Sequence, residues 1–574
     1  MVPGRLLALI VDDWHLLVNN WLDLFKKEYL WVGLGLAAVL LAQSSAVDFS
    51  NQLGQDEWSI LPAITGRFVP VNPTRPLELL FNYFVVVIVG QQRQLGHLFL
   101  LALKLGNGFL TYLLVRNYKE TELWFAFSCA SLALVYIVDD HFLLYGVLFS
   151  ARLHSGMCLV LLSLYLYRRF IDMGRPLDFI FAVCANVGSN LVYEFGIPLQ
   201  LALPLLFLAL YRRRQGIYLA SYGVWLLATV GSQFSAILGV IRGDTSTYQS
   251  SSFGFSFPHL IQGTMWQLAY AFGPILRPTT DRLKYFPLSA LLMFGVMVFT
   301  MLLLRGRVTA NGAGANRAPS VYLGWLFVGA VVTWLSPLLY LLAVGGTTSP
   351  MRKHVLAAVG EAMAVCAAIW WVSSWVWSER VRNVIRIGAV AFVAALGAVQ
   401  AADTQKTLNS WGGMWETQAV FLRSIVNVVP AVKHSALIVY VENASVSTVP
   451  FTWPEPFQGA IEYAYGGQVQ GVMSDRGGYL KIMRDGAVTR SPARTYRWSE
   501  LIVITKDLYG RAVVLDTLPA DLFMDPATGA VDKELLAYAV DRYRPRDLIA
   551  PSFVSPLVQE MFPPLQFAAA PNFK

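Results

Sequence analysis

Charged residues are scarce in this 574-residue chain, at 14% of the total, whereas 56% of the residues are hydrophobic. A soluble protein of this length would fold as several domains, whose surfaces bring the charged fraction to about a quarter. The composition therefore excludes an ordinary soluble protein and indicates a membrane protein. Cysteine is scarcer still. Its four occurrences lie in apolar runs without paired spacing, so neither a disulfide framework nor a zinc site is expected.

The few charges are unevenly distributed along the chain. Residues 404–574 contain 16 Lys and Arg and 16 Asp and Glu, so this tail is neutral and resembles a soluble domain. The first 403 residues therefore carry the whole net charge of +8. Because this basic excess lies between apolar runs, it indicates membrane topology and not a nucleic-acid partner.

The apolar runs predict a polytopic helical membrane protein. A helix that crosses a bilayer needs about 20 predominantly apolar residues. The sequence predicts about eleven such helices, at residues 29–46, 97–115, 122–138, 153–167, 177–192, 195–211, 217–240, 286–304, 320–343, 354–376 and 384–403. Residues 1–28 mix charges with apolar residues at helical spacing, which predicts an amphipathic helix lying along the membrane surface.

Two further apolar segments fit the spanning pattern less well. Residues 75–90 are short for a span, and a span there would break the alternation of charge, so a juxtamembrane or re-entrant helix is expected. Residues 258–276 leave the same choice open, because Gly263, Gly273 and Pro274 weaken a continuous helix.

Basic clusters on every second connection orient the chain. Lys and Arg are enriched in the cytoplasmic loops of membrane proteins. This tendency places the N-terminus in the cytoplasm, and it places loop 47–96 and the C-terminal residues 404–574 outside it. The expected location is a plasma membrane, here the inner membrane of a bacterium. The clusters are Lys26/Lys27, Arg116/Lys119, Arg168/Arg169/Arg175, Arg212/Arg213/Arg214, Arg305/Arg307/Arg317 and Arg380/Arg382/Arg386.

The sequence thus divides into an interfacial helix at 1–28, a membrane domain at 29–403 and an extracytoplasmic domain at 404–574. The last is predicted to be a small α/β or α+β domain. Its pattern favours helices at 411–427 and 533–541 and strands at 437–441, 501–505 and 512–515.

Several ionisable residues fall in the predicted outer loops. Asp56 and Glu57 follow the first span, and Asp139, Asp140 and His141 follow the third. Carboxylates at a membrane boundary either face water or hold a ligand. The Asp139–His141 group is explained by a helix cap or polar stop, or alternatively by a divalent ion or cationic ligand, and its spacing fits no strong metal pattern.

Two more candidates lie beside later spans. Glu194 sits between two long apolar runs, where an ionisable group is a functional candidate and a hairpin cap is an equal alternative. Arg352 and Lys353 form a basic cluster on the outer face, against the positive-inside tendency. A phosphate-bearing lipid ligand would explain them, and snorkelling to lipid headgroups is the alternative.

Taken in order along the chain, these features resemble the GT-C superfamily of polytopic glycosyltransferases, in particular protein O-mannosyltransferase-like enzymes and their bacterial relatives. The likeness covers about two thirds of the chain. Two departures from the family pattern are plain. The family has a Lys before its glutamate where this chain has Tyr193, and the family's Arg-Tyr motif is matched by Arg352-Lys353-His354, which lacks the tyrosine. The matching stretches are Asp56-Glu57, Arg75-Pro76-Leu77, Gly96-His97, TYLLVRN ending at Arg116, Ser150-Ala151-Arg152, Tyr193-Glu194 and Arg352-Lys353-His354.

The resemblance implies an inverting transfer of a sugar from a polyprenyl-phosphate donor to a protein, lipid or glycan acceptor outside the cytoplasm. Asp56 would act as general base, and Glu57 would orient the acceptor or Asp56. Arg352 and Lys353, with Arg75, would bind the donor phosphate. No cofactor is required, and a divalent cation (Mg²⁺ or Mn²⁺) is left open. Residues expected at the acceptor or a secondary site are Glu194, Asp139, Asp140, His141, Arg152 and His97.

Two other classes of protein stay open at this stage. One is a lipid or solute transporter with an accessory domain, although the sequence shows no clear internal duplication. The other is a catalytically silent relative that acts as a scaffold in a membrane complex and docks a partner protein through its C-terminal domain. Donor binding without turnover would favour the scaffold.

Overall fold

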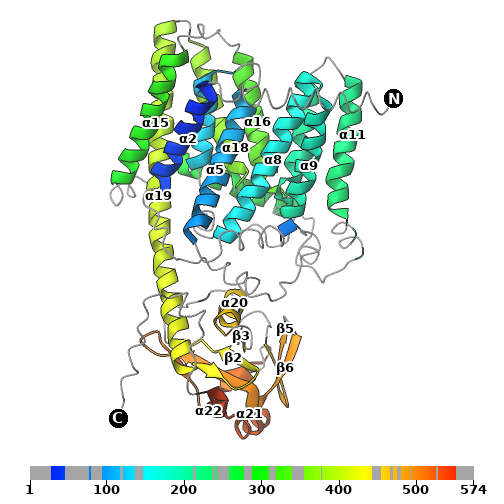
Figure 1. Cartoon of the computed structure of the whole chain (residues 1–574), viewed down its shortest axis with the longest axis vertical. Helices are drawn as coiled ribbons and strands as arrows, with labels where there is room; N and C mark the ends of the chain where they lie inside the picture. The colour runs from blue at the N-terminus through cyan, green and yellow to red at the C-terminus, as the bar shows by residue number, and fades with distance from the viewer. Residues whose placement is uncertain are drawn as a thin grey trace.

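The structure, a computed structural model, is a bundle of apolar helices joined by one long helix to a C-terminal α/β domain (Figure 1). It describes residues 27–44, 77–78, 93–116, 121–135, 147–210, 215–234, 238, 242, 257–276, 287–308, 319–338, 355–376, 378–442, 451, 454–465, 469–474, 480–490, 493–524 and 528–550.

Helices in the bundle lie roughly side by side, and successive ones mostly run in opposite directions (Figure 1). Their apolar side chains form one continuous core. The helices are α2 (Lys27–Ser44), α5 (Arg93–Arg116), α6 (Leu123–Val135), α8 (Val147–Met173), α9 (Pro176–Val192), α10 (Ile197–Leu210), α11 (Gln215–Ser232), α14 (Phe257–Leu276), α15 (Pro287–Val308), α16 (Pro319–Leu335), α18 (Ala357–Ser374) and α19 (Glu379–Val428).

Each of the eleven predicted segments contains a helix, which confirms a mostly helical fold. By length and composition, three helical stretches of the described chain could cross a membrane: Leu95–Arg116, Ala357–Ser374 and Arg380–Val399. Five others are apolar but shorter, at Glu28–Ser44, Leu123–Val135, Pro176–Val192, Ala290–Thr300 and Pro319–Leu335. These apolar helices indicate a membrane protein, and the number of helices that cross stays a prediction.

The structure forms a helix where the sequence left the choice open, and it joins two helices that were expected to be separate. Residues 257–276 form one unbroken helix, α14, although Gly263 and Gly273 weaken helices and Pro274 lacks an amide donor. Pro274 stands in the last turn, so the helix ends soon after the lost hydrogen bond. The segments 384–403 and 411–427, expected as separate helices, are parts of the 50-residue helix α19. The predicted boundary at 403/404 therefore falls inside a helix, where no turn or linker marks it.

Helices α16 and α18 approach each other at two glycines. A Cβ built on Gly329 would lie 2.6 Å from the backbone nitrogen of Ala364, and one built on Gly360 would lie 2.5 Å from that of Thr333. Backbone atoms cannot move aside as a flexible side chain can, so only glycine fits this crossing. Small residues allow such contact between membrane helices.

The C-terminal domain contains a four-stranded sheet in the order β3-β2-β7-β8. Strand β2 (Ala436–Tyr440) is parallel to both β3 (Val469–Met473) and β7 (Leu501–Lys506), and β8 (Ala512–Val514) is antiparallel to β7. Helix α20 (Pro454–Ala464) connects β2 to β3. The expectation of an α/β or α+β domain is met by this mixed sheet.

Both faces of the sheet are covered. The last turns of α19 and helix α20 pack on one face, around Phe421, Ile438 and Ile502. An antiparallel sheet and helix α21 (Lys533–Val540) pack on the other, around Leu437, Tyr496 and Val503. That second sheet consists of β4 (Leu480–Met483), β5 (Gly486–Arg490) and β6 (Ala493–Arg497). Strand β1 (Ala431–Val432) follows α19 and pairs with β9 (Ile549–Ala550), after the short helix α22 (Pro545–Leu548).

Candidate functional site

Three of the predicted site residues belong to the described part of the chain. His97 lies near the start of α5, Arg152 near the start of α8, and Glu194 in the 3₁₀ turn η2 (Glu194–Gly196) between α9 and α10. These positions share the end of the bundle that faces the C-terminal domain (Figure 1). The other candidates lie outside the described residues, namely Asp56, Glu57, Arg75, Asp139, Asp140, His141, Arg352 and Lys353.

Arg152 has the best-defined surroundings of the three. Its side chain is buried and forms an ion pair with Glu78. Its guanidinium also lies over the ring of Tyr193, 5.4 Å from the ring centre. A guanidinium is planar and attracted to an aromatic face, so carboxylate and ring together fix its orientation.

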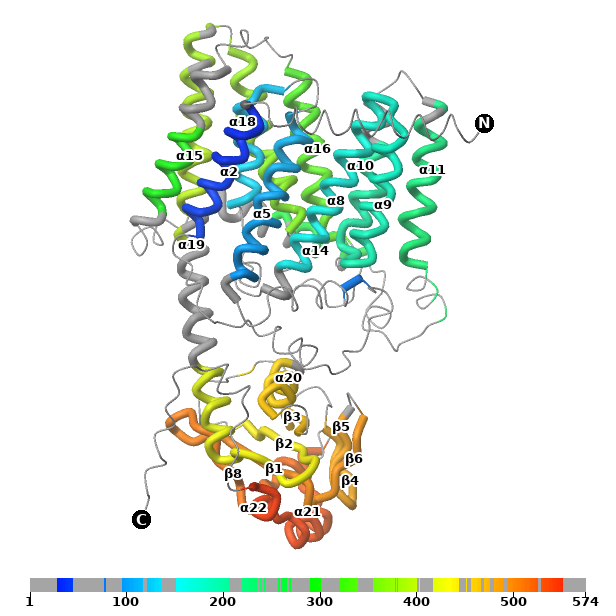
Figure 2. The backbone as a smooth tube through the Cα atoms, viewed as in Figure 1, coloured from blue at the N-terminus to red at the C-terminus, as the bar shows by residue number. Residues whose placement is uncertain are grey.

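Glu78 comes from the predicted juxtamembrane segment 75–90. Only Leu77 and Glu78 of that segment are described, and both are helical. In Figure 2 this short blue segment lies near the end of the bundle that faces the C-terminal domain. Because Arg152 belongs to α8, the ion pair joins the loop that carries Asp56 and Glu57 to the bundle.

Glu194 directly follows Tyr193, the residue on which Arg152 stacks. Tyr193 has an extended backbone and ends α9, its amide donating to the carbonyl of Ser189. Its ring packs edge-on against Phe195, 5.4 Å between centres, and Phe195 in turn closes on Gly156 of α8. Arg152 and Tyr193 are thus in contact, whereas the role of Arg152 and Glu194 at an acceptor or secondary site stays a prediction.

A buried polar stripe continues from this end along α5. Its members recur at the three- and four-residue spacing of one helix face, which packs against α8. Asn107 contacts His154 of α8 twice, since its Nδ2 donates to the His154 carbonyl at 3.1 Å and lies 3.3 Å from the ring Nδ1. The buried polar residues of the stripe are His97, Lys104, Asn107 and Thr111.

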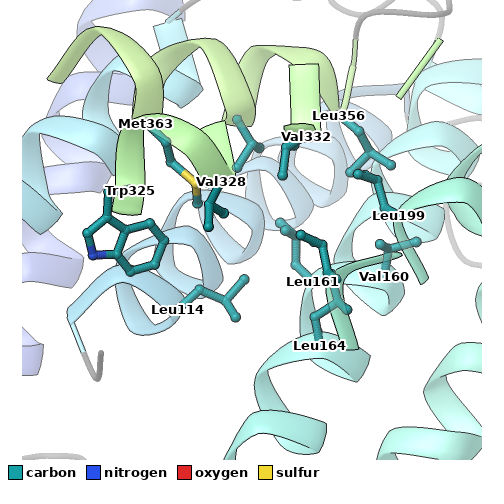
Figure 3. Close-up of a pocket in the computed structure, with 12 residues that line it drawn as sticks. Leu114, Val160, Leu161, Leu164, Leu199, Trp325, Val328, Val332, Leu356 and Met363 are labelled. Carbon is teal, nitrogen blue, oxygen red and sulfur yellow. The ribbon is translucent and has the colours of Figure 1, made fainter. Parts of the chain in front are cut away.

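An apolar cavity lies deeper in the bundle, between α5, α8, α10, α16 and α18 (Figure 3). It has a volume of about 30 Å³, and its twelve lining residues are Leu, Val, Trp and Met, with Leu161, Trp325 and Met363 among them. A space of one or two waters lined this way stays dry and offers no group for acid–base chemistry. This cavity is therefore not a candidate functional site.

The described chain offers no cluster of side chains that could ligate a metal ion. Among the described residues, no three His, Cys, Asp or Glu side chains come close enough to hold a metal ion. The one metal-type group noted in the sequence, at Asp139–His141, lies outside them.

Sequence reasoning assigned no role to Glu78 or Lys104. Glu78 carries the only charge between Arg75 and Gly90, and a lone carboxylate in an apolar helix was the available signal. Lys104 is a single cation inside the apolar run 97–115, which a hydropathy average hides.

Comparisons with known proteins leave the family open. No protein-family model matches the chain, and no curated protein matches it. Among solved structures, one that is similar is that of ArnT from Cupriavidus metallidurans in the apo state. The identity is 14%, the match covers 84% of this chain and 97% of that one, and the TM-score is 0.39. A likeness this loose carries no argument about either fold or function.

Proposed function

We propose that this protein is a membrane glycosyltransferase, which moves a sugar from a polyprenyl-phosphate donor to an acceptor hydroxyl on the extracytoplasmic face. The observation that carries the proposal is the meeting of Glu78, Arg152 and Tyr193 at one end of the bundle. These residues come from three distant stretches of the sequence, two of which match the family pattern. Their meeting supports a site at this end, next to the loop that carries Asp56.

The proposed reaction is a single inverting displacement. Asp56 removes the proton of the acceptor hydroxyl, and the acceptor oxygen bonds to the anomeric carbon of the sugar. The bond from that carbon to the phosphate oxygen breaks on the opposite side, and polyprenyl phosphate leaves with the electron pair. Arg352, Lys353 and Arg75 stabilise the charge that develops on it, and Glu57 orients Asp56 or the acceptor.

Arg152 has a positioning role in this proposal. Its ion pair with Glu78 attaches the end of the predicted outer loop to α8, and the proposed role is to orient the part of that loop on which the reaction depends. Orientation of reacting groups supplies much of the acceleration in such reactions. Glu194, one residue from Tyr193, lies where an acceptor reaching this end would pass, and His97 lines the same end on α5.

The test is sugar transfer by the purified full-length chain from a radiolabelled polyprenyl-phosphate sugar, with wild type and Asp56→Asn compared. Removing the base is expected to lower the rate by about 10²–10⁴-fold. Asp48→Asn, in the same outer loop, is the matched control and should retain the wild-type rate. EDTA, Mg²⁺ and Mn²⁺ are tested in parallel, because the sequence leaves a divalent cation open. Full transfer by folded Asp56→Asn protein would refute the assignment of the base.

A further inference from the structure

Lys104 is the least expected side chain in the bundle. It stands at the middle of α5 with 4% of its surface exposed, and no described residue accepts a hydrogen bond from its Nζ. An ammonium group removed from water without an anion or acceptor is costly, and inside a membrane domain such a group marks a functional site. Something outside the described protein atoms is therefore expected to complete it.

A second unsatisfied group lies one helical turn away. Asn107 is also buried, and its Nδ2 is used in the contacts with His154. Its Oδ1 accepts no hydrogen bond from any residue that the structure describes. Residues three apart on a helix have Cβ atoms about 5–6 Å apart. A cationic donor and a neutral acceptor are thus left open side by side.

The pair faces the site already described. Helices α5 and α8 run in the same direction and touch where Asn107 meets His154. Lys104 precedes Asn107, and Arg152 precedes His154, so both cations lie on the same side of that contact, toward the C-terminal domain. A donor bound at Lys104 would therefore extend toward the end of the bundle that carries Arg152.

The chemistry of the two open groups restricts what can satisfy both. Lys104 needs an anionic oxygen, whereas the carbonyl-type Oδ1 of Asn107 repels an anion and needs a hydrogen-bond donor, which a hydroxyl can supply. A bare phosphate satisfies only the first, and a neutral sugar leaves the cation without a counter-charge. A phosphorylated sugar carries a phosphoryl oxygen and a ring hydroxyl within a few bonds of each other.

We infer that Lys104 and Asn107 bind the junction of phosphate and sugar in the donor, with Lys104 on a phosphoryl oxygen and Asn107 accepting from a sugar hydroxyl. The inference rests on the proposed function, because that function supplies a sugar linked directly to a lipid phosphate. It adds a donor subsite between α5 and α8, distinct from the predicted phosphate ligands Arg352, Lys353 and Arg75.

The experiment measures dissociation constants for the full-length chain in nanodiscs of neutral lipid. Two probes are used, polyprenyl phosphate and the polyprenyl-phosphate sugar. Lys104→Met removes the charge at nearly constant volume and is expected to weaken both probes by about tenfold or more. Lys104→Arg keeps the cation and should bind both within about threefold of wild type.

Asn107→Leu separates the two halves of the subsite. It should weaken the glycosylated probe and leave polyprenyl phosphate unchanged, which removes the preference for the sugar. Thr111→Val is the matched control, because Thr111 lies on the same buried stripe but donates within its own helix, to the Asn107 carbonyl at 2.8 Å. This variant should bind both probes like wild type. Thermal unfolding of each variant shows whether it is folded.

Several outcomes would overturn the inference. If wild type transfers sugar and Lys104→Met binds both probes unchanged, then buried water completes the site and only the subsite is wrong. If phosphatidylglycerol or inorganic phosphate displaces the glycosylated probe as effectively as polyprenyl phosphate does, then the site accepts phosphates in general. If wild type binds neither probe, the proposed function itself fails.

Discussion

The two ends of the helix bundle use their charges differently. At the end away from the C-terminal domain, carboxylates and arginines form direct ion pairs. Each pair joins two bundle helices, or one helix and the short segment that precedes another. At the other end, Arg152 pairs with Glu78 from an outer loop, and Lys104 is buried beyond it with no ionic partner in the described chain. The pairs at the first end are Glu28–Arg116 at 2.9 Å, Glu122–Arg386 at 2.5 Å and Asp178–Arg169 at 3.5 Å.

In the proposed function, the charges of the first end are structural and those of the second end serve the site. At the first end each of these pairs links the termini of two helices, as Glu122 does when it accepts hydrogen bonds from both Arg386 and Trp370. Such an arrangement joins packed helix termini directly through ion pairs. Farther from that end, Lys104 at the middle of α5 has no described partner, and in the proposed function the anionic donor supplies one.

The largest loss of stability is expected at the close crossing of α16 and α18. Gly329→Leu would force a side chain into the backbone of α18, since even a Cβ there meets Ala364 at 2.6 Å. We expect a loss of about 3 kcal/mol or more, because overpacking displaces the backbone here and not a side chain. Thermal unfolding in detergent measures it. Gly324→Leu on the same helix is the control, since a Cβ there meets nothing within 4 Å. Equal stability of the two variants would contradict the close crossing.

A smaller loss is expected at the structural end alone. Glu122→Gln would leave the half-buried Arg386 without its counter-charge, which is expected to lower stability by about 2 kcal/mol, less than for a fully buried pair. Sugar transfer per folded molecule should stay at the wild-type level. The comparison of the two ends would be wrong if transfer fell with stability unchanged.

The smallest effect is expected for an ion pair on the exterior of the C-terminal domain. Hydrogen bonding from Arg546 holds the pKa of Asp516 below its usual value, with Nε 2.8 Å from Oδ1. A lowered folded-state pKa contributes stability that is present above the unfolded pKa, near 3.9, and lost as pH falls through the folded one. Asp516→Asn should therefore lower the unfolding midpoint slightly at pH 7 and not at pH 2. Because both side chains are exposed, salt should abolish the difference. A large, salt-resistant loss would contradict this.

Periodicity and charge predicted much of the bundle, for physical reasons. Apolar runs must be helical in a membrane, so all eleven segments were recognisable. Among the described residues, three predicted clusters lie at helix termini of one end of the bundle, namely Arg116, Arg168/Arg169/Arg175 and Arg380/Arg382/Arg386. Strand β2, fully buried, was recognisable as a short apolar run, whereas β6, with ARTYR mostly exposed, carries no apolar pattern. The continuity of α19 was not predictable, because Gly412 and Gly413 and the polar residues before them favour a break by intrinsic propensity, and the helix continues through them all the same.

The candidate site was predictable only in part. Arg152 and Glu194 were named from the family pattern, and the contact of Arg152 with Tyr193 was not predicted. Glu78 and Lys104 were not predicted to have roles, since their importance depends on which helices pack together and not on any local motif. The predicted base Asp56 and the predicted phosphate ligands stay predictions, because they lie outside the described residues.

One paired measurement tests the central claim most directly: Arg152→Met and Arg386→Met, each assayed for sugar transfer per folded molecule and for the thermal unfolding midpoint. Arg152→Met should reduce transfer by about 10²-fold, because the outer loop loses its anchor on α8. Arg386→Met should lower the midpoint and leave transfer unchanged. Wild-type transfer by folded Arg152→Met protein, with the loss of activity appearing in Arg386→Met instead, would contradict the assignment of function to the end of the bundle that faces the C-terminal domain.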